Sequence, residues 1–360
     1  MHKPVKALAV SVAAVLALAP MAASAQGACN SPGGATYQLS LTSVPRADLK
    51  GKAFRTSLTV NGQPHDVLLD TGSPAVNVPR SLLSNVTVLS TNQQYGYVSS
   101  GIYYMGDWVL ASVSLTATDE KGKTVTLTTP QMPVFGAIKS CHGKPPNATC
   151  KPLAAKDGLG MMGIGYKPYK VPVAQPPAQP LLSTNVLLNL PETKNNSGYV
   201  ISADSFTVGV PKDSGFKMVP LSGSGDSLAP QGCIAYTAVN GQAGPFCGSL
   251  LMDTGINHLY LTMPTAAYCP AGLGRKKVKV TVTAPSGAGA QPALHWVYTT
   301  APRQATSTGA GSSGDNCATE DPAKPATGYH INTGRMLLAD YNYLYDATCN
   351  AVGFHPVPRR

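Results

Sequence analysis

The triplet Asp-Thr-Gly occurs twice in this chain of 360 residues, at positions 70–72 and 253–255. Each copy follows an uninterrupted apolar run, Val67 to Leu69 in the first case and Leu250 to Met252 in the second. Each carboxylate therefore stands where an apolar segment ends. Two such copies, 183 positions apart, indicate duplicated halves that bring two buried acids together. Paired acids in different environments are the chemistry of acid-dependent hydrolysis.

The elements that must position these acids are predicted to be strands. Short stretches rich in Val, Thr, Leu and Tyr alternate in polarity, and Gly, Pro and Asn separate them at intervals of roughly 8 to 12 residues. This pattern predicts a mostly β protein. One hairpin is expected from Ala53–Val60, a turn at residues 61–64 and the strand Asp66–Leu69. The first acid, Asp70, then lies where that strand stops.

Helical patterns are few. Leu181–Leu190, which ends before Pro191, is the best candidate for a short helix, and Ala266–Tyr268 is expected to start another. Lys167–Pro180 contains five prolines and is expected to be an exposed connection near the junction of the two halves. The stretch from Arg303 to Gly328 is rich in small residues and predicts a long loop.

The first 25 residues have the composition of a secretory signal peptide. Lys3 and Lys6 precede the apolar stretch Ala7–Ala19, and Ala23–Ala25 supplies a small-residue cleavage site. The apolar stretch is too short to cross a bilayer and no later one is long enough, so we expect no membrane span. The sequence thus predicts a secreted or periplasmic protein. The rest of the chain is long enough for two cores, and we expect an N-terminal lobe over residues 26–190 and a C-terminal lobe over 191–360.

Composition limits the classes of partner. The chain is 43% hydrophobic and only 12% charged, which is typical of a globular protein. Residues 1–25 contain two lysines and no acid, so their removal lowers the net charge from +10 to +8, a balance that favours acidic surfaces or envelope polymers. No run of Lys or Arg is long enough to indicate nucleic-acid binding. The densest basic spot, Lys276 and Lys277, is expected to start a strand with a solvated face.

Eight cysteines outside the predicted signal fit four disulfides in an oxidising compartment. Their positions suggest the pairs Cys141–Cys150, Cys233–Cys247, Cys269–Cys317 and Cys29–Cys349. The last pair would join the two ends of the chain. No close Cys-x-x-Cys or His-x-x-x-His spacing is present, so we expect neither a zinc site nor any other metal or cofactor.

These residues, taken in order, resemble the pepsin-like aspartic peptidases along most of the mature chain. Phe54–Asp70 is similar to the family's opening hairpin and first catalytic loop, and Val78-Pro79 falls where that family has Val-Pro. Tyr95 and Gly96 resemble the flap tyrosine and its glycine. The resemblance implies a mostly β, two-lobed double-ψ β-barrel architecture with a few short helices. A short signal followed by no room for a propeptide fits a bacterial exported member.

The resemblance continues in the second half of each repeat. Residues 157–166, which contain Gly163, resemble the segment of two apolar residues and a glycine that crosses under the first catalytic loop. Gly334, in the stretch 332–334, lies at the corresponding place in the second half. Arg335–Phe354 looks like the terminal strands of that fold.

The resemblance implies that Asp70 and Asp253 form a catalytic dyad. Two carboxylates held this close cannot both ionise, so they share one proton and hold a water molecule between them. The charged acid takes a proton from the water, and the protonated acid donates to the scissile carbonyl oxygen. Water then adds without a covalent enzyme intermediate.

Five neighbours are expected to support the dyad. Thr71 and Thr254 would hydrogen-bond backbone across the pair of loops and hold the acids in register. Gly72 and Gly255 would let the backbone turn sharply and offer an N–H to a carboxylate. Ser73 would hydrogen-bond the carboxylate of Asp70.

The predicted flap carries the first departure from the family pattern. Tyr95, with Gly96 beside it, would close over a bound peptide and exclude water. Asn77 stands where the family generally has a Trp that supports this tyrosine, which predicts weaker flap closure. The flap follows Asp70 by only 25 positions, so Tyr97 and Tyr103 are alternatives for the flap tyrosine.

The second loop carries two further departures. Ile256 takes the place of the Ser or Thr expected three residues after Asp253, which predicts the loss of one hydrogen bond worth about 0.5 to 1.5 kcal/mol. Asp253 should then be the less well supported acid. Asn332-Thr333 replaces two apolar residues before Gly334 and requires local hydrogen-bond partners.

The sequence therefore predicts a monomeric aspartic endopeptidase that cleaves peptide or protein substrates at acidic pH. The alternative is a non-catalytic pepsin-like protein of the cell envelope that binds or inhibits. Ile256, Asn77 and Asn332 favour this alternative, whereas retention of both aspartates and both threonines opposes it. A third reading, a carbohydrate- or envelope-binding β protein, requires the ordered resemblance to be accidental.

Overall fold

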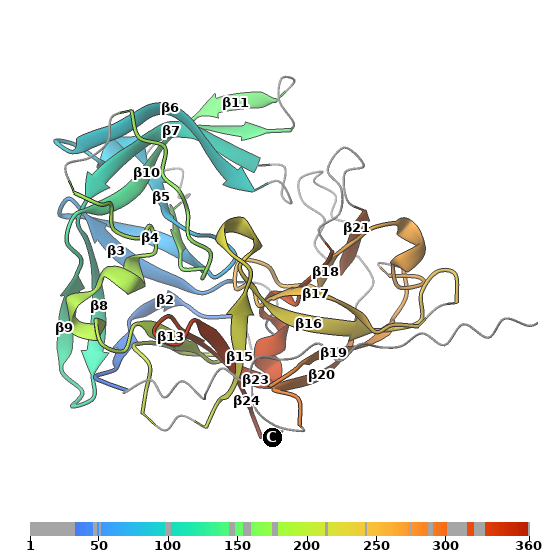
Figure 1. Ribbon diagram of the computed structural model, residues 1–360. Helices are drawn as coiled ribbons and strands as arrows, with labels where there is room; N and C mark the ends of the chain where they lie inside the picture. Colours follow the sequence, from blue (N-terminus) through green and yellow to red (C-terminus); the bar gives the residue numbers. More distant parts are fainter. Residues whose placement is uncertain are drawn as a thin grey trace, which may run out of the picture.

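The two acids lie in a mostly β, two-lobed molecule (Figure 1). The computed structural model describes residues 33–45, 49, 52–97, 102–143, 148–153, 160–174, 179–212, 215–241, 243–273, 275–286, 291–300, 315–319 and 328–358. The predicted signal peptide lies outside these residues. Within them, no helix is long and apolar enough to cross a membrane.

The first lobe is built from strands β2 to β12. They are β2 (Leu41–Ser43), β3 (Arg55–Val60), β4 (Gln63–Asp70), β5 (Val76–Pro79), β6 (Thr87–Tyr97), β7 (Ile102–Ala111), β8 (Val113–Asp119), β9 (Thr124–Thr128), β10 (Met132–His142), β11 (Thr149–Pro152) and β12 (Gly160–Gly163).

The second lobe is built from strands β16 to β22, in yellow to red in Figure 1. They are β16 (Ala229–Ala235), β17 (Phe246–Leu251), β18 (Tyr260–Met263), β19 (Lys279–Ala284), β20 (Leu294–Thr299), β21 (Asn316–Thr319) and β22 (Tyr329–Asn332). β19 contains most of the strand predicted after Lys277.

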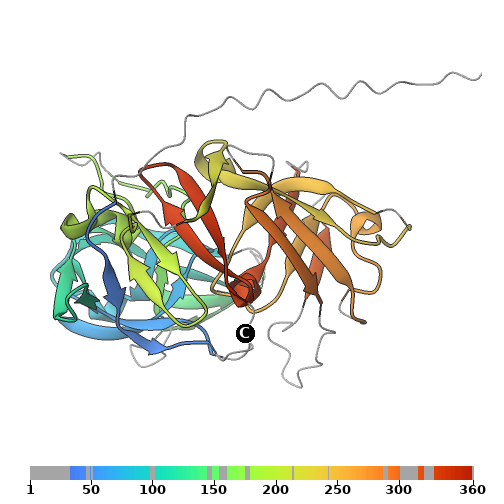
Figure 2. The same cartoon turned by 90° about the horizontal axis from the view of Figure 1, so that it is seen from below.

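A sheet of strands from both ends and the middle of the chain joins the lobes. Its spatial order is β1 (Tyr37–Leu39), β14 (Phe206–Val208), β13 (Gly198–Ile201), β23 (Tyr341–Asp346), β24 (Ala351–Pro356) and β15 (Lys217–Ser222). Figure 2 shows the red terminal strands between the two lobes. The prediction that the chain ends in strands is therefore confirmed for residues 341–346 and 351–356, whereas residues 334–339 form a 3-10 helix instead.

The two lobes repeat one pattern of strand pairing. In the first, β12 is parallel to β4 and antiparallel to β5, which is parallel to β10. In the second, β22 is parallel to β17 and antiparallel to β18, which is parallel to β21. Because both direction and order agree, β4 corresponds to β17 and β12 to β22. The duplication indicated by the two triplets is thus present in the topology.

The hairpin before the first acid forms as predicted, with slightly different ends. β3 and β4 pair from Arg55↔Leu68 to Val60↔Gln63, so the turn contains only Asn61 and Gly62. Both turn residues have positive φ, 52° and 74°, which is the conformation of a tight hairpin turn and explains the Asn-Gly pair. β4 alternates toward a buried end, where Val67, Leu69 and Asp70 are all inside.

Regular helices in the described residues are single 3-10 turns or little more. They are η1 (Arg80–Leu82), η3 (Val186–Asn189), η4 (Pro191–Thr193), η5 (Gly225–Ser227), η6 (Ala266–Tyr268) and η7 (Gly334–Ala339). The prediction at Ala266–Tyr268 is confirmed as one turn.

The predicted helix over Leu181–Leu190 is wrong except at η3. Polar side chains tie its first half to other backbone: Thr184 Oγ1 donates to Pro74 O at 2.6 Å, and Asn185 Nδ2 donates to Gly165 O at 3.2 Å. Asn185 Oδ1 also accepts from Leu187 N at 3.0 Å. The first two bonds hold the chain extended against other strands and loops, and the third caps the start of η3, so only the last turn is helical.

Three of the four predicted disulfides are confirmed. They are Cys141–Cys150 between β10 and β11, Cys233–Cys247 between β16 and β17, and Cys269–Cys317 between η6 and β21. The second closes the hairpin that leads to Asp253. Cys29 lies outside the described residues, so its pairing with Cys349 stays a prediction. Several disulfides fit a protein of an oxidising compartment.

Candidate active site

The two aspartates meet at the ends of corresponding strands. Asp70 is the last residue of β4, and Asp253 follows β17 by two positions. Their exposed fractions are only 6% and 9%. The two carboxyl groups lie close together across the pair of loops, since a Cβ added to Gly255 would be within 3.0 Å of an oxygen of each. The structure therefore brings together the two acids that the sequence singled out.

Glycine is required beside each acid because the opposite carboxyl group lies against it. A Cβ added to Gly72 would lie 2.6 Å from Asp253 Oδ2, and one added to Gly255 would lie 2.7 Å from Asp70 Oδ1. Both distances are shorter than the contacts that Cβ atoms make in real proteins. Any larger residue at either position would push the opposite acid away.

The two threonines connect the loops reciprocally. Thr71 N donates to Thr254 Oγ1 at 3.1 Å, and Thr254 N donates to Thr71 Oγ1 at 3.0 Å. The hydroxyls in turn donate to Met252 O at 2.5 Å and to Leu69 O at 2.7 Å. Both side chains are buried. Because each hydroxyl both accepts and donates across the loops, the backbones that carry the acids are held in register as predicted.

Asp70 receives two hydrogen bonds from its own loop. Gly72 N donates to Oδ1 at 2.8 Å, and Ser73 Oγ donates to Oδ2. Burial first, and then the negative charge of Asp253, raise the pKa of Asp70 well above its ordinary value, and the donors Ser73 and Gly72 oppose this only in part. The raised pKa keeps a proton on the pair at acidic pH.

Asp253 accepts as many hydrogen bonds as Asp70, which corrects the prediction that it is the less well supported of the two acids. Gly255 N donates to Oδ1 at 2.8 Å, as in the first loop. The side-chain amide of Asn332, at the end of β22, donates to Oδ2 at 2.8 Å. The hydrogen bond that Ile256 cannot make is therefore supplied by the strand beneath the loop.

The polar stretch before Gly334 finds the partners that it requires. Asn332 Oδ1 accepts from Gly334 N at 2.9 Å, and Thr333 Oγ1 donates to Leu251 O at 3.3 Å. Arg335 follows, with only 2% of its side chain exposed; its Nη1 donates to Thr254 O at 3.2 Å and its Nε to Leu49 O at 2.8 Å. A buried cation thus lies under the second loop.

The predicted flap residues, Tyr95 and Gly96, lie beside the first loop. Six residues line a pocket of about 270 Å³: Gly72, Pro74, Gln94, Tyr95, Gly96 and Tyr169. β6 pairs with β7 in the register Tyr95↔Tyr104 and Gly96↔Tyr103. Residues 98–101, between these strands in the sequence, lie outside the described part of the chain. Tyr95 lines this pocket, so it stays the proposed flap tyrosine in preference to Tyr97 or Tyr103.

The sequence predicts weak support for Tyr95, because Asn77 stands in place of a Trp. The structure shows that another tryptophan, Trp108, packs against Tyr95 instead. The Tyr95 ring contacts Trp108 edge to face with ring centroids 5.6 Å apart, and it also contacts Phe135 at 5.2 Å and Tyr169 at 5.6 Å. Trp108 comes from β7 rather than from the position of Asn77 on β5. Aromatic pairs at these distances are each worth about 0.5 to 1.5 kcal/mol beyond burial.

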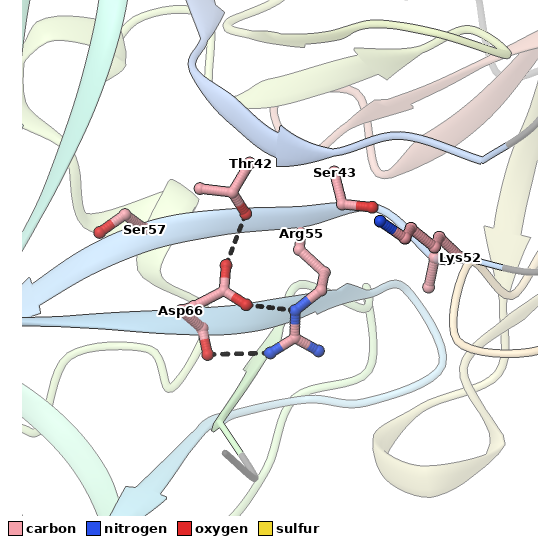
Figure 3. A pocket seen from close by; sticks show the side chains of 7 residues that line it. Thr42, Ser43, Lys52, Arg55, Ser57 and Asp66 are labelled. Carbon is pink, nitrogen blue, oxygen red and sulfur yellow. Dashed lines mark hydrogen bonds and ion pairs between the residues drawn. The ribbon is translucent and has the colours of Figure 1, made fainter. Parts of the chain in front are cut away.

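A larger hollow of about 600 Å³ lies in the first lobe, around β2, β3 and β4. Figure 3 shows Thr42, Ser43, Lys52, Arg55, Ser57 and Asp66 around it. The Arg55 guanidinium donates to the Asp66 carboxylate and backbone oxygen, and Thr42 also donates to Asp66. Because its acid is already paired and no dyad residue lines it, this hollow is separate from the candidate active site.

Three residues of the site were missed or misread in the sequence: Asn332, Arg335 and Trp108. Asn332 had a signal, since a polar residue stood where apolar ones belong, but its partner was not predicted. Arg335 and Trp108 gave none, because their contacts depend on tertiary structure. Among the described residues, no cluster of His, Cys, Asp or Glu could hold a metal ion.

Comparison with known proteins supports the fold. No protein-family model matches the chain, and no match is found among curated proteins. Among solved structures, the chain is similar to an aspartic proteinase from Irpex lacteus, with a TM-score of 0.53 and 15% identity. The similarity covers 89% of this chain and 98% of that one. At this identity the match shows a shared pepsin-like fold, and it extends over both lobes.

Proposed function

We propose that this protein is an aspartic endopeptidase whose catalytic residues are Asp70 and Asp253. The observation that carries the proposal is the pair of buried carboxyl groups that lie close together across the two loops. Each of them accepts two hydrogen bonds, and the threonines fix the loops that carry them. Such a pair holds one proton and positions one water molecule for attack on a carbonyl.

The substrate is a peptide or protein chain in an extended conformation, bound between the lobes and under Tyr95. The ionised acid takes a proton from the water as it adds to the scissile carbonyl carbon. The protonated acid donates to the carbonyl oxygen, which gives a tetrahedral diol, and collapse of the diol transfers a proton to the leaving nitrogen. Closure of the flap excludes bulk water from the site during these steps, apart from the attacking water molecule.

The rate of hydrolysis should be highest at acidic pH. The mechanism needs one proton on the pair, and the raised pKa of Asp70 keeps it there until the pH rises through that value. Activity then falls at higher pH. Export as a secreted or periplasmic monomer, with removal of residues 1–25 and lobes over 26–190 and 191–360, completes the proposal.

The non-catalytic alternative loses its main support. Its arguments were Ile256, Asn77 and Asn332, and the structure gives Asp253 a donor from Asn332 and gives Tyr95 aromatic neighbours from β7 and β10. A binding protein without activity remains the outcome to be tested against.

The test is hydrolysis of an acid-denatured protein by the purified chain between pH 3 and 7. We expect Asp70→Asn and Asp253→Asn each to lose at least about a thousandfold in rate, because each removes a group that transfers a proton. A statine-type transition-state mimic should inhibit the wild type.

A matched control is Asp66→Asn, the same change at an exposed position of β4, which should keep the wild-type rate within about twofold. Equal inertness of wild type, both dyad variants and the control across this pH range would reject the enzyme. Binding of the statine mimic by an inert wild type would support the binding alternative.

A further inference from the structure

Asn332 and Met161 occupy the same position in the two halves of the site. In the parallel pair β4–β12, Met161 is the partner of Leu68, which precedes Asp70 by two residues. In β17–β22, Asn332 is the partner of Leu251, which precedes Asp253 by two residues. The inference below rests on the proposed function and concerns this exchange of an apolar residue for an amide.

The two positions act on their acids differently. Met161 Sδ lies 3.0 Å from Ser73 Oγ, and Ser73 in turn contacts Asp70 Oδ2. Asn332 contacts Asp253 Oδ2 directly, through Nδ2 at 2.8 Å. Oδ2 of Asp70 therefore faces a hydroxyl group, and Oδ2 of Asp253 faces an amide NH₂ group.

A hydroxyl and an amide NH₂ differ in what they can do when a carboxyl group is protonated. Ser73 can donate to an ionised Asp70, or it can accept from a protonated Asp70 and turn its own hydrogen toward Met161 Sδ. Asn332 cannot reverse, because its Oδ1 accepts from the backbone N–H of Gly334 and this fixes which end of the amide faces Asp253. Its NH₂ group only donates.

Two further neighbours of Asp253, Gly255 and Arg335, also favour its ionised form. Gly255 N donates to the other oxygen, so both oxygens face donors. The buried guanidinium of Arg335 interacts electrostatically with Asp253. His330, on the same strand as Asn332, bonds Ser249 Oγ through Nδ1 at 2.8 Å.

Two other titratable groups are near Asp253, and both are mostly neutral once the pH is well above 4. Burial and the charge of Lys167 lower the pKa of His330 to about 4, which the negative charge of Asp253 opposes, so this histidine is neutral over most of the acidic range. Tyr166 is also neutral, because burial and then the charges of Asp253 and Tyr345 raise its pKa. Among the described residues, the buried Arg335 is thus a charged group that favours negative charge on Asp253.

We propose that Asn332 is a positioning residue that keeps Asp253 as the ionised acid of the pair and so assigns the shared proton to Asp70. In catalysis Asp253 then takes the proton from water, and Asp70 donates to the substrate carbonyl oxygen. Arg335 reinforces this assignment through its charge.

The test exchanges the supporting residues of the second half for those of the first. Asn332→Met removes the amide donor, and the double variant Asn332→Met/Ile256→Ser adds a hydroxyl at the position that Ser73 has beside Asp70. The profile of kcat/KM against pH is measured for both variants, for Ile256→Ser alone and for the wild type, with folding checked by near-UV circular dichroism.

We expect the acid limb of the Asn332→Met profile to move up by about one pH unit, the effect of losing one hydrogen bond to a charged group. kcat at the optimum should fall about tenfold with KM within twofold, since substrate contacts are unchanged. The double variant should return the acid limb to within about 0.3 unit of the wild type. Ser73→Ala is the matched control in the first half, and it should shift the alkaline limb while leaving the acid limb in place.

A second measurement does not depend on activity. Because the lost bond is to a carboxylate, the melting temperature of Asn332→Met should fall below that of the wild type by an amount that grows as the pH rises from 2 to 6. Asn332→Ala replaces Asn332→Met in both measurements if the methionine does not fold.

An acid limb that stays in place in Asn332→Met, or a double variant that does not restore it, would show that Asn332 is only structural. A melting-temperature difference that is constant with pH would show the same. An inert wild type with a pH-dependent difference would instead reject the proposed function and keep the assignment of charge to Asp253.

Discussion

The two halves of the site support chemically identical carboxylates by different means. In the first half the second donor comes from the loop itself, through Ser73. In the second half the loop has Ile256, and the donor comes from the underlying strand, through Asn332. The glycine N–H donors and the threonine cross-links are the same in both halves, with distances that agree within 0.2 Å.

This difference shows that a supporting hydrogen bond can change its origin while the geometry of the acid is kept. A side chain three residues after the acid in the loop, and one on the strand beneath the loop, can both hydrogen-bond Oδ2 of the acid. A substitution at one position can therefore be compensated at the other. The change is not neutral, because a hydroxyl can accept a hydrogen bond from a protonated acid and an amide NH₂ group cannot.

The largest effect should come from the feature that the two halves share. Gly72→Ala and Gly255→Ala each place a Cβ within 2.7 Å of the opposite carboxyl group, so the acids must separate. We expect each variant to lose at least about a hundredfold in kcat/KM, the cost of misplacing a reacting group by about 1 Å. Overpacking should also lower the free energy of unfolding by about 1 to 3 kcal/mol. Full activity in either variant would contradict the close approach of the acids.

A smaller effect, on the melting temperature, should show whether Asp70 holds the shared proton. The pKa of Asp70 is raised in the folded state, so its protonated form contributes stability that is fully present below the unfolded value of about 3.9 and is lost as the pH rises through the folded value. In the Asp70→Asn variant this position cannot ionise, so its contribution to stability does not change with pH. The variant's melting temperature should therefore exceed that of the wild type by a margin that grows above about pH 4, by about 2 °C or more for each unit of the shift. Parallel curves from pH 3 to 7 would contradict the raised pKa.

The smallest effect should come from the apolar position of the first half. Met161→Leu conserves volume and removes only a weak sulfur contact with Ser73. We expect kcat/KM within about threefold of the wild type and a loss of less than about 1.5 kcal/mol in the free energy of unfolding. The same leucine at position 332 should cost about tenfold in kcat, because it removes a donor to Asp253. Similar losses at both positions would mean that the halves do not differ in the way described.

Much of the framework could be predicted from neighbouring residues. The Asn61-Gly62 turn fixes the hairpin before Asp70, and the spacing of the cysteines gave three pairs that the structure confirms. The helix over Leu181–Leu190 could not be predicted correctly, because Thr184 and Asn185 bond to backbone that is distant in the chain.

The supports of the site were harder to predict than its acids. Ile256 and Asn77 each looked like a defect when read alone. Their replacements, Asn332 and Trp108, lie 79 residues from Asp253 and 13 residues from Tyr95, on other strands. A defect and its compensation can be recognised together only when the strand pairing is known.

The sequence by itself determined which groups are present: two acids, each with its threonine and glycine, at the ends of apolar strands. These features depend on spacings of a few residues, which local geometry turns directly into structure. Only the tertiary structure decided which donor reaches each acid, because the register between β17 and β22 places Asn332 beside Asp253. Such a contact depends on strand pairing between residues far apart in the chain, and no local pattern records it.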